Sequence, residues 1–306
     1  MPISEVEKIW FNGELVAWKD AQVHVLTHAL HYGSGVFEGI RCYGTPQGPA
    51  VFRLRDHLRR LVRSAKLYYM PVPYSVEELY EATFAVITAN RLDACYVRPL
   101  VFRGYGEMGL FPLNAPVKTI IACWPWGAYL GDEGVKHGIR AKVSSFQSLD
   151  HTALARAAKA TGQYLNSILA KVEVTNAGYD EAIMLTAHGH VAEGSGENIF
   201  LVRDGVLMTP PASDGVLEGI TRDSVIKLAA AMDIQYEEKT LARSDVVIAD
   251  EAFFTGTAAE IVPIREVDDH PIGEPGPITR RMQDRFRAVV EGRDPEFGYF
   301  MEYPGG

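Results

Sequence analysis

Cysteine is scarce in this sequence, whose 306 residues contain only Cys42, Cys95 and Cys123. Their number is odd and their spacing is wide, so they indicate neither a disulfide framework nor a CxxC metal or redox motif. We interpret all three as small residues of the hydrophobic core.

Long apolar runs and basic tracts are also missing. The longest uncharged apolar stretch, residues 119–130, contains Pro125 and Gly127 and is shorter than the ~20 residues that span a bilayer. The 39 acidic residues outnumber the 30 basic ones, and no basic tract carries interleaved aromatic residues. The sequence therefore predicts no membrane anchor and no nucleic-acid binding. Early charges at residues 5–8 are unlike a signal peptide and favour a cytoplasmic protein.

Several enzyme fingerprints are absent as well. GxxxxGK[ST] does not occur, and the glycine turn at residues 33–35 completes neither this motif nor GxGxxG. The GxGxxG spacing occurs at residues 104–109, but the proline-containing stretch after it lacks the helix pattern that the dinucleotide fingerprint requires. This argues against a P-loop enzyme and against an NAD-dependent oxidoreductase. The run at residues 194–196 lacks the spacing of a serine-hydrolase elbow.

Three histidines, His24, His28 and His31, stand four and three residues apart, which would suit metal ligation on a helix. The stretch has no clear helical period, and no acidic or cysteine partner accompanies it. We predict histidines that are hydrogen-bonded within the core or an interface, and no metal site.

What is present is a mixture of strand and helix patterns without strict alternation. Residues 36–41 and 95–102 are typical of strands. Residues 56–70 predict a helix with one apolar face, formed by Leu58, Leu61, Val62, Ala65 and Tyr69. Ser75 and Glu78 form a capping-box pattern before a second helix, whose apolar positions are Leu79, Ala82, Val86 and Ile87.

The second half of the chain continues this mixture. Strand patterns cover residues 139–146, 181–186, 198–202 and 252–255, and helix patterns cover residues 163–176, 221–232 and 277–291. Asp204-Gly205 predicts a hairpin turn, and Pro277 and Gly292 predict the ends of the last helix. The glycine- and aromatic-rich segment 124–134 has neither period. We predict an α/β (α+β) fold with a smaller N-terminal domain (1–123), an interdomain loop (124–136) and a larger C-terminal domain (137–306).

Two segments offer backbone N–H groups that would suit a phosphate. Residues 217–224 place a glycine and Thr221 directly before a helix, whose dipole favours an anion. Residues 256–260 gather small residues after a strand. Either alone resembles an ordinary turn, but together, without a nucleotide fingerprint, they favour a phosphorylated cofactor other than ATP or a dinucleotide.

Three charged residues are candidates for chemistry, and each has a plainer alternative. Lys159 lies among small residues, and a desolvated lysine is a usable nucleophile, but an exposed lysine on an alanine-rich turn looks the same. Glu193 is flanked by a glycine-rich run that is also common in surface loops. Arg98 shares a strand face with Tyr96, and spacing alone favours a structural ion pair for it.

Taken in order, these segments resemble the branched-chain amino acid aminotransferases, which are pyridoxal-phosphate enzymes of fold type IV. The resemblance is carried by Phe37-Glu-Gly-Ile-Arg41, Tyr96-Val-Arg-Pro-Leu-Val-Phe102, Ala157-Ala-Lys159 through Tyr164, Glu193-Gly-Ser-Gly-Glu-Asn198, Gly219-Ile-Thr-Arg-Asp223 and Gly256-Thr-Ala-Ala-Glu260. It runs from Ile9 nearly to the end of the sequence. It implies a two-domain architecture with the cofactor at the domain interface.

The resemblance also implies roles around pyridoxal 5'-phosphate (PLP). Lys159 matches the lysine that forms the Schiff base with the cofactor and moves the proton during catalysis. Glu193 matches the carboxylate paired with the pyridine nitrogen, and Tyr164 matches the partner of the phenolic oxygen. The residues implied at the phosphate are Arg60, Ile220, Thr221 and Thr257.

On the substrate side, the resemblance implies one pocket that accepts an alkyl group in one half-reaction and a carboxylate in the other. The residues implied to line it are Tyr32, Phe37, Gly39, Trp126, Tyr129 and Tyr164. Tyr96 and the N–H groups of Thr257 and Ala258 would hold the α-carboxylate, and Arg98 the side-chain carboxylate of glutamate. Tyr32, Met108 and Leu110 are expected from the neighbouring subunit, which implies at least a homodimer, with a trimer of dimers as a larger alternative.

The implied activity is transamination of L-leucine, L-isoleucine and L-valine with 2-oxoglutarate. D-amino acid transaminases, (R)-amine transaminases and a deoxychorismate lyase of the same fold class share the lysine and the glutamate, but the pocket motifs at Phe37, Tyr96 and Met108 favour the branched-chain activity. A cofactor-binding protein without catalysis is disfavoured because the lysine, glutamate, tyrosine and arginine are all retained. One departure is that Ala155, followed by Arg156, replaces a proline common in relatives, and we expect it to loosen the approach to Lys159.

Overall fold

The computed structural model describes residues 3–126 and 131–305. The chain forms two compact units, each assembled from separate stretches. Unit 1 contains Met1–Gly127, Ala158–Gln163 and Val289–Gly306, and unit 2 contains Ala128–Ala157 and Tyr164–Ala288. This division differs from the predicted domains in that the short segment around Lys159 and the last residues belong to unit 1. Among the described residues, no helix has the length and apolar character needed to cross a membrane.

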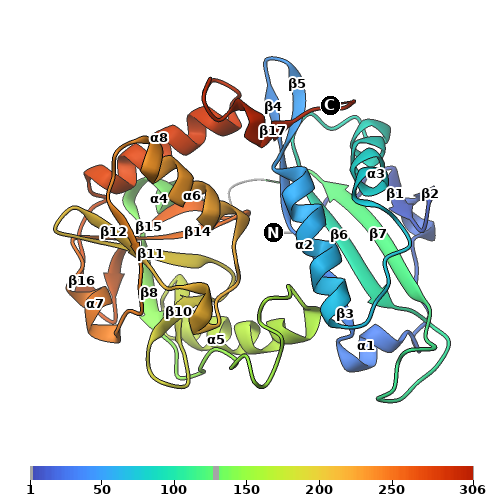
Figure 1. Cartoon of the computed structure of the whole chain (residues 1–306), viewed down its shortest axis with the longest axis horizontal. Helices are drawn as coiled ribbons and strands as arrows, with labels where there is room; N and C mark the ends of the chain where they lie inside the picture. Colours follow the sequence, from blue (N-terminus) through green and yellow to red (C-terminus); the bar gives the residue numbers. More distant parts are fainter. Residues whose placement is uncertain (1–2, 127–130, 306) are drawn as a thin grey trace. The chain divides into compact units, whose positions relative to one another are not determined.

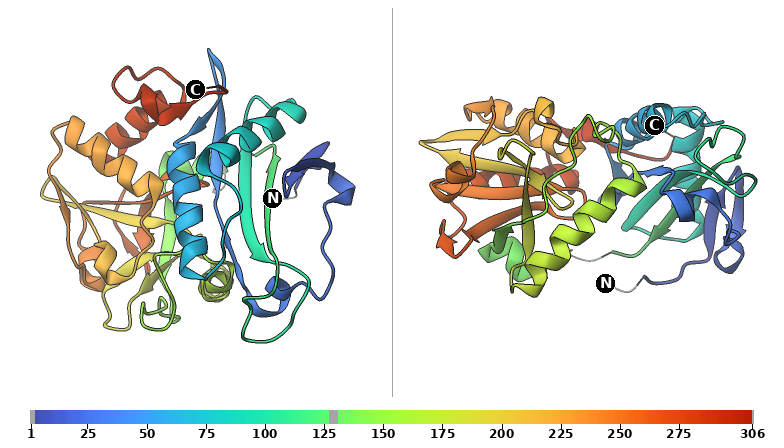
Figure 2. Two further views of the ribbon diagram at one scale, coloured as in Figure 1. Left: turned by 45° about the vertical axis from the view of Figure 1, so that its right-hand side comes forward. Right: turned by 90° about the horizontal axis from the view of Figure 1, so that it is seen from below.

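Unit 1 is built on an antiparallel sheet. Its strands follow the order β17 (Met301–Glu302), β5 (Gly48–Phe52), β4 (Ile40–Thr45), β6 (Cys95–Arg103), β7 (Val117–Trp124), β1 (Lys8–Phe11) and β2 (Glu14–Ala17), and β3 (Gly35–Phe37) also pairs with β6. Helices α2 (Leu54–Leu67) and α3 (Val76–Ala89) pack together against this sheet (Figures 1 and 2). The short helix α1 (His28–Tyr32) precedes β3.

The apolar faces predicted for the two long helices are largely confirmed. Leu58, Leu61 and Ala65 of α2 are fully buried, and the four predicted apolar positions of α3 are buried behind the predicted capping box. Tyr69 is the exception, because α2 ends at Leu67. Tyr69 has a left-handed backbone (φ 54°) and is 76% exposed. The Met70 N–H then donates to the Ala65 carbonyl, and this hydrogen bond terminates the helix.

All three cysteines lie in the hydrophobic core of unit 1, as predicted. Cys42, Cys95 and Cys123 are free thiols with at most 1% exposure. They come from β4, β6 and β7, three strands that are neighbours in the sheet. Each therefore fills a small space between the sheet and its helices.

The strand predicted for residues 36–41 is in fact two strands. β3 and β4 keep the same register on β6, with Phe37 opposite Leu100 and Ile40 opposite Val97. Pro99 interrupts the ladder between these pairs, because proline has no N–H to donate. The carbonyl of Pro99 still accepts from the Glu38 N–H at 2.9 Å.

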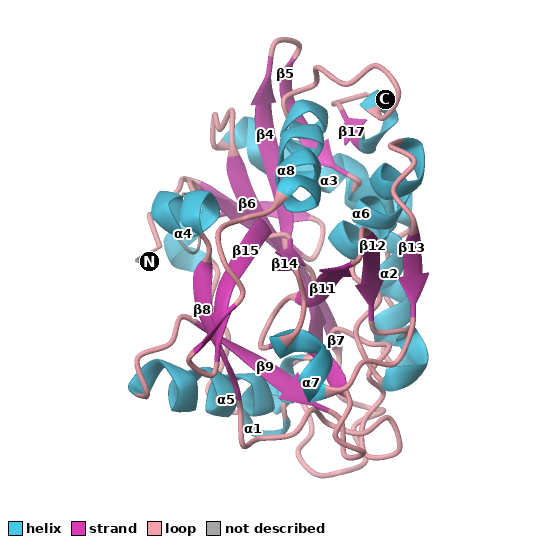
Figure 3. Ribbon diagram, turned by 90° about the vertical axis from the view of Figure 1, so that its left-hand side faces the viewer, coloured by secondary structure: helices cyan, strands magenta, loops and turns pink. Residues whose placement is uncertain are grey.

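Unit 2 contains a mixed sheet with helices around it. The strand order is β10 (Val191–Gly194), β9 (Glu181–Leu185), β8 (Ile139–Val143), β15 (Glu260–Val267), β14 (Glu251–Gly256), β11 (Asn198–Arg203), β12 (Val206–Thr209) and β13 (Tyr236–Glu238), with β16 (His270–Pro271) on β15. Figure 3 shows β12 and β13 side by side, and this pair is parallel, as are β8 with β9 and β8 with β15. The helices are α4 (Gly131–His137), α5 (Tyr164–Asn176), α6 (Ile220–Ala231), α7 (Arg243–Val247) and α8 (Pro277–Val290).

Local signals of the second half are confirmed in unit 2. Asp204 and Gly205 both have positive φ and join β11 to β12, as expected for a two-residue hairpin. Helix α8 begins at Pro277, and Gly292 follows its end with φ 70°. The segment predicted as a loop, residues 124–136, is only partly described, and helix α4 already begins at Gly131.

Candidate active site

Lys159 is held in unit 1 by its own backbone. Its carbonyl accepts from the Phe37 N–H at 3.0 Å, and its N–H donates to the Ser64 hydroxyl of α2 at 3.1 Å. The next residue, Ala160, forms a bridge with Val36 of β3. The Lys159 ammonium lies 5.2 Å from the centre of the Phe37 ring. These contacts fit a lysine placed on the sheet better than one on a solvated turn.

A buried charge cluster lies beside this lysine. Glu38 is fully buried and accepts hydrogen bonds from Arg60 Nε and Nη2 and from His57 Nδ1, each at 2.7 Å. Burial alone would raise the pKa of Glu38, but Arg60 and His57 outweigh it and hold this pKa at about 2. Burial lowers the pKa of His57, and the charges of Arg60 and Lys159 add to that lowering against the opposing effect of Glu38. Arg60, predicted at a phosphate, thus has an orientation set by Glu38, a residue for which the sequence predicts no role.

Arg98 lies against aromatic side chains rather than in a structural ion pair. We call the group formed by Phe37, Tyr96 and Trp126 the aromatic wall. Its guanidinium carbon is 4.6 Å from the centre of the Phe37 ring, and its Nη2 donates to the Tyr96 hydroxyl at 3.1 Å. Among the described residues it has no carboxylate partner, and its buried Nε has no hydrogen-bond partner. The ion pair favoured on spacing alone is therefore wrong for the described part of the chain. A guanidinium left without a carboxylate in such a place is costly and suits an anionic ligand.

Trp126 and Gly39 complete this wall. The Trp126 ring lies 4.8 Å from that of Tyr96, centre to centre. A Cβ on Gly39 would lie 2.0 Å from the Tyr96 hydroxyl oxygen, so only glycine fits there while Tyr96 keeps its place. Tyr129, predicted in the same pocket, lies outside the described residues.

The residues predicted to act on a neighbouring subunit are brought together by His28. Its Nε2 bonds the Gly109 carbonyl at 2.8 Å, and the centre of its ring lies 4.5 Å from that of Tyr32, with the two rings tilted by 36°. Tyr32, Met108 and Leu110 are 44%, 46% and 91% exposed. The predicted hydrogen-bonded core histidine is confirmed for His28, which is buried. His24 and His31 are exposed and bond the nearby backbone.

The remaining described residues predicted for the site belong to unit 2, namely Tyr164, Glu193, Ile220, Thr221, Thr257 and Ala258. The Glu193 carboxylate is 9% exposed and accepts from the Leu217 N–H at 3.0 Å, from Asn198 Nδ2 at 3.2 Å and from Arg156 Nη2. Asn198 also donates to the Leu217 carbonyl at 2.9 Å. One amide side chain therefore ties Glu193 to the segment that leads into helix α6.

The start of α6 is arranged for an anion. Ile220 and Thr221 are its first residues, both buried, and its N-cap residue Gly219 has no side chain that could cap the helix, so the positive end of the helix dipole is available to an anion. A Cβ on Gly219 would lie 2.0 Å from Asn198 Oδ1, so this position also needs glycine.

Thr257 and Ala258 occupy the turn between β14 and β15, where Gly256 pairs with Glu260. Asn198 pairs with Thr255 on β14, which brings this turn to the same end of the sheet as Glu193. A Cβ on Gly256 would lie 3.4 Å from Glu197 Cγ. Tyr164 is the first residue of α5 and is half-buried.

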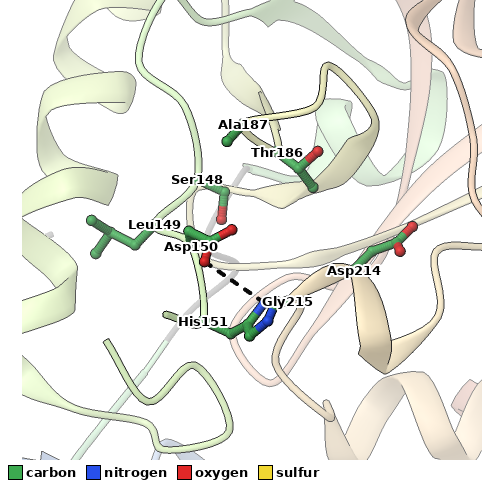
Figure 4. A pocket seen from close by; sticks show the side chains of 8 residues that line it. All are labelled: Ser148, Leu149, Asp150, His151, Thr186, Ala187, Asp214 and Gly215. Carbon is green, nitrogen blue, oxygen red and sulfur yellow. Dashed lines mark ion pairs between the residues drawn. The ribbon is translucent and has the colours of Figure 1, made fainter. Parts of the chain in front are cut away.

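A pocket on unit 2 lies apart from these residues. It is lined by Ser148, Leu149, Asp150, His151, Thr186, Ala187, Asp214 and Gly215 (Figure 4). Asp150 and His151 form an ion pair of 3.9 Å within it. None of the predicted site residues lines this pocket, although the Gly215 carbonyl also accepts from Arg156.

Comparison with known proteins decides the family. The amino-transferase class IV family model matches residues 35–267. A branched-chain-amino-acid aminotransferase of Pseudomonas aeruginosa is 50% identical over 287 residues, which cover 93% of each chain. The chain belongs to the branched-chain-amino-acid aminotransferases of class IV. The resemblance found in the sequence is thereby confirmed.

Solved structures of the same family match nearly the whole chain. The crystal structure of the Escherichia coli branched-chain amino acid aminotransferase has a TM-score of 0.96 and 47% identity, and the match covers 98% of this chain and 100% of that one. The branched-chain amino acid aminotransferase of Thermobaculum terrenum, solved in its PLP form, has a TM-score of 0.92 and 36% identity, with 99% of each chain covered. The predicted fold class is confirmed by these matches.

Proposed function

We propose that this chain transfers the amino group of L-leucine, L-isoleucine and L-valine to 2-oxoglutarate, with PLP as its cofactor. The observation that carries the proposal is the aromatic wall of unit 1. There the Arg98 guanidinium has no carboxylate partner among the described residues and lies on the Phe37 ring. Such a surface accepts either an alkyl side chain or a carboxylate, which the two half-reactions require.

The residues present fit PLP. Glu193 is a buried carboxylate able to face a pyridine nitrogen, and helix α6 begins at Ile220 without a side-chain cap, so that its positive dipole end suits a phosphate. PLP supplies, when bound, a ring that withdraws electrons from the amino acid Cα. The chain supplies Lys159, whose amine moves a proton at that Cα, and Glu193, whose negative charge favours a protonated ring nitrogen.

The substrate carboxylates would be divided between two groups of donors. Tyr96, with the N–H groups of Thr257 and Ala258, would hold the α-carboxylate, and Arg98 would hold the side-chain carboxylate of glutamate. Arg98 is suited to this because its planar guanidinium forms paired hydrogen bonds with a carboxylate. Phe37 and Trp126 would pack against the alkyl chains.

A homodimer is part of the proposal. Helix α1, the segment before it and the loop after β6 expose large apolar side chains, namely Val25, Leu30, Tyr32, Met108, Leu110 and Phe111. Apolar groups gathered in this way favour a protein partner, and a second copy would place Tyr32 and Leu110 at the neighbouring site. A chain that sediments as a monomer at micromolar concentration would contradict this assembly.

The substrate class is tested by single-turnover reactions. The PLP-loaded protein is mixed with L-leucine, D-alanine or (R)-1-phenylethylamine, and conversion of the cofactor is followed by absorbance. Rapid conversion with L-leucine alone is expected. Faster conversion with D-alanine or the (R)-amine would instead identify the chain as a D-amino acid or (R)-amine transaminase.

Lys159 is tested by covalent trapping. Borohydride should fix PLP on the peptide that contains Lys159, whereas Lys159→Ala should lose the label and reduce turnover by about 10³-fold or more, as expected when a catalytic proton donor and acceptor is removed. Lys171→Ala is the matched control, since Lys171 pairs with Glu181 at 2.6 Å and has no proposed role. A label that persists in Lys159→Ala would disprove the assignment.

A further inference from the structure

Arg156 is tied to the carboxylate that the proposed function places behind the cofactor ring. Its Nη2 donates to Glu193 Oε1, and its Nε donates to the Gly215 carbonyl at 3.0 Å. Both side chains of the pair are only 11% exposed. Arg156 directly follows Ala155, the residue that stands where relatives commonly have a proline, and it brings a charged side chain to Glu193.

The two oxygens of Glu193 meet different donors. Oε2 accepts from the Leu217 N–H and from Asn198, which are neutral groups, while Oε1 accepts from the Arg156 guanidinium. A carboxylate that serves a protonated ring nitrogen therefore already carries a full positive charge at one oxygen. The nitrogen and the guanidinium would share one anion.

We propose that Arg156 is a positioning residue that sets how strongly Glu193 attracts the protonated ring nitrogen of PLP. The inference rests on the proposed function, because it takes Glu193 as the partner of that nitrogen. Two cations that bind the same buried carboxylate repel each other. The positive charge of Arg156 therefore disfavours the protonated form of a ring nitrogen beside Glu193. Arg156 thus keeps Glu193 oriented but weakens the attraction between the Glu193 carboxylate and the protonated ring nitrogen.

The test compares PLP with its deaza analogue, in which a carbon replaces the ring nitrogen. Arg156→Met removes the charge at similar length, and Arg156→Lys keeps the charge as the matched control. Dissociation constants for both ligands are measured by equilibrium dialysis of the cofactor-free protein. Arg156→Met should bind PLP about tenfold more tightly, the size expected when a like charge shifts a nearby ionisation by about one pKa unit. Arg156→Lys should bind PLP as the wild type does, and both variants should bind the analogue as the wild type does.

Two results would overturn the proposal. Equal changes for PLP and the analogue would mean that Arg156 acts on the shape of the site, and unchanged PLP affinity in Arg156→Met would mean that the charge is not felt by the ring. If Arg156→Met proves unstable, Arg156→Gln replaces it in the same comparison.

Failure of the proposed function gives a different pattern. Glu193→Gln should weaken PLP binding and leave the analogue unaffected if Glu193 faces the ring nitrogen. If wild type and Glu193→Gln bind both ligands equally, the assignment of Glu193 is wrong whatever Arg156 does. If Glu193→Gln behaves as expected, the Arg156 comparison tests the further inference alone.

Discussion

The absence of a side chain at Gly39 leaves room for the Tyr96 hydroxyl. Gly39 lies next to the Pro99 interruption between β3 and β4, and the Tyr96 hydroxyl occupies the space that a Cβ would need. The same hydroxyl accepts from Arg98. A methyl group at residue 39 would therefore displace two residues of the proposed substrate wall at once.

We expect Gly39→Ala to lower the free energy of unfolding by about 1–3 kcal/mol, the usual cost of overpacking a core. All four tryptophans belong to unit 1, so tryptophan fluorescence during urea unfolding reports on it. Tyr96→Phe removes the oxygen that clashes. The double variant Gly39→Ala/Tyr96→Phe should recover part of the loss, and strictly additive losses would show that the clash is not the cause.

At this scale the sequence predicted residue types better than contacts. Lys159, Glu193 and Arg98 stand in recognisable motifs, and the buried cysteines and bonded histidines follow from chemistry. Glu38 and Arg156 had no such signal, because their partners lie 22 and 37 positions away and only the folded chain brings them together. Pairings of that kind cannot be derived from local spacing.

At the scale of elements, helix α8 depends on a side chain from a strand. Glu251 begins β14, and its carboxylate accepts from the N–H groups of Ile278 at 3.1 Å and Thr279 at 2.7 Å. A Cβ on Gly276 would lie 2.3 Å from the Glu251 carboxyl carbon, so the chain before the helix must be glycine there. The negative charge also suits the positive end of the helix dipole.

Glu251→Ala should destabilise unit 2 by about 1–3 kcal/mol, because it leaves two N–H groups of the helix without an acceptor. Glu251→Gln keeps one acceptor oxygen and should fall between the wild type and the alanine variant. Urea unfolding followed by circular dichroism measures the order of the three proteins. If glutamine and alanine cost the same, the capping contact is not what stabilises the helix.

Most elements could be predicted because their signals are local. Periodic apolar residues, the Ser75 capping box and the Asp204 turn each act over a few neighbouring residues. One error came from a longer-range effect, because Pro99 on the neighbouring strand β6 divides the predicted strand into β3 and β4. The other was local, because Tyr69 leaves its helix through a left-handed turn. The assignment of residues 158–163 to unit 1 depends on pairing with β3, a strand far earlier in the sequence.

At the scale of the whole molecule, the Glu38 cluster makes the acid stability of unit 1 depend on one carboxylate. Its folded pKa of about 2 lies below the value of 4.5 for a free glutamate. Its contribution is therefore complete above pH 4.5 and is lost as the pH falls towards 2. His57 acts in the same direction at higher pH, since its lowered pKa means that protonation below about 6.5 opposes folding.

We expect Glu38→Gln to be less stable than the wild type by about 3 kcal/mol more at pH 5 than near pH 2, from ~1.4 kcal/mol per pKa unit. Tryptophan fluorescence during urea unfolding at several pH values gives the two curves. The curves should converge as the pH falls. Parallel curves would mean that Glu38 titrates normally in the folded protein.

The return of residues 289–306 to unit 1 has a consequence for how the chain is made. β17 pairs with β5, and Arg55 Nη1 donates to Glu302 Oε2 at 2.6 Å. These two residues are 247 positions apart in the sequence. While the ribosome is still translating the second unit, β5 remains an open edge to which other nascent chains could add a strand. Folding of the first unit should thus be completed late, and a chaperone that shields β5 during synthesis should raise the yield of native protein.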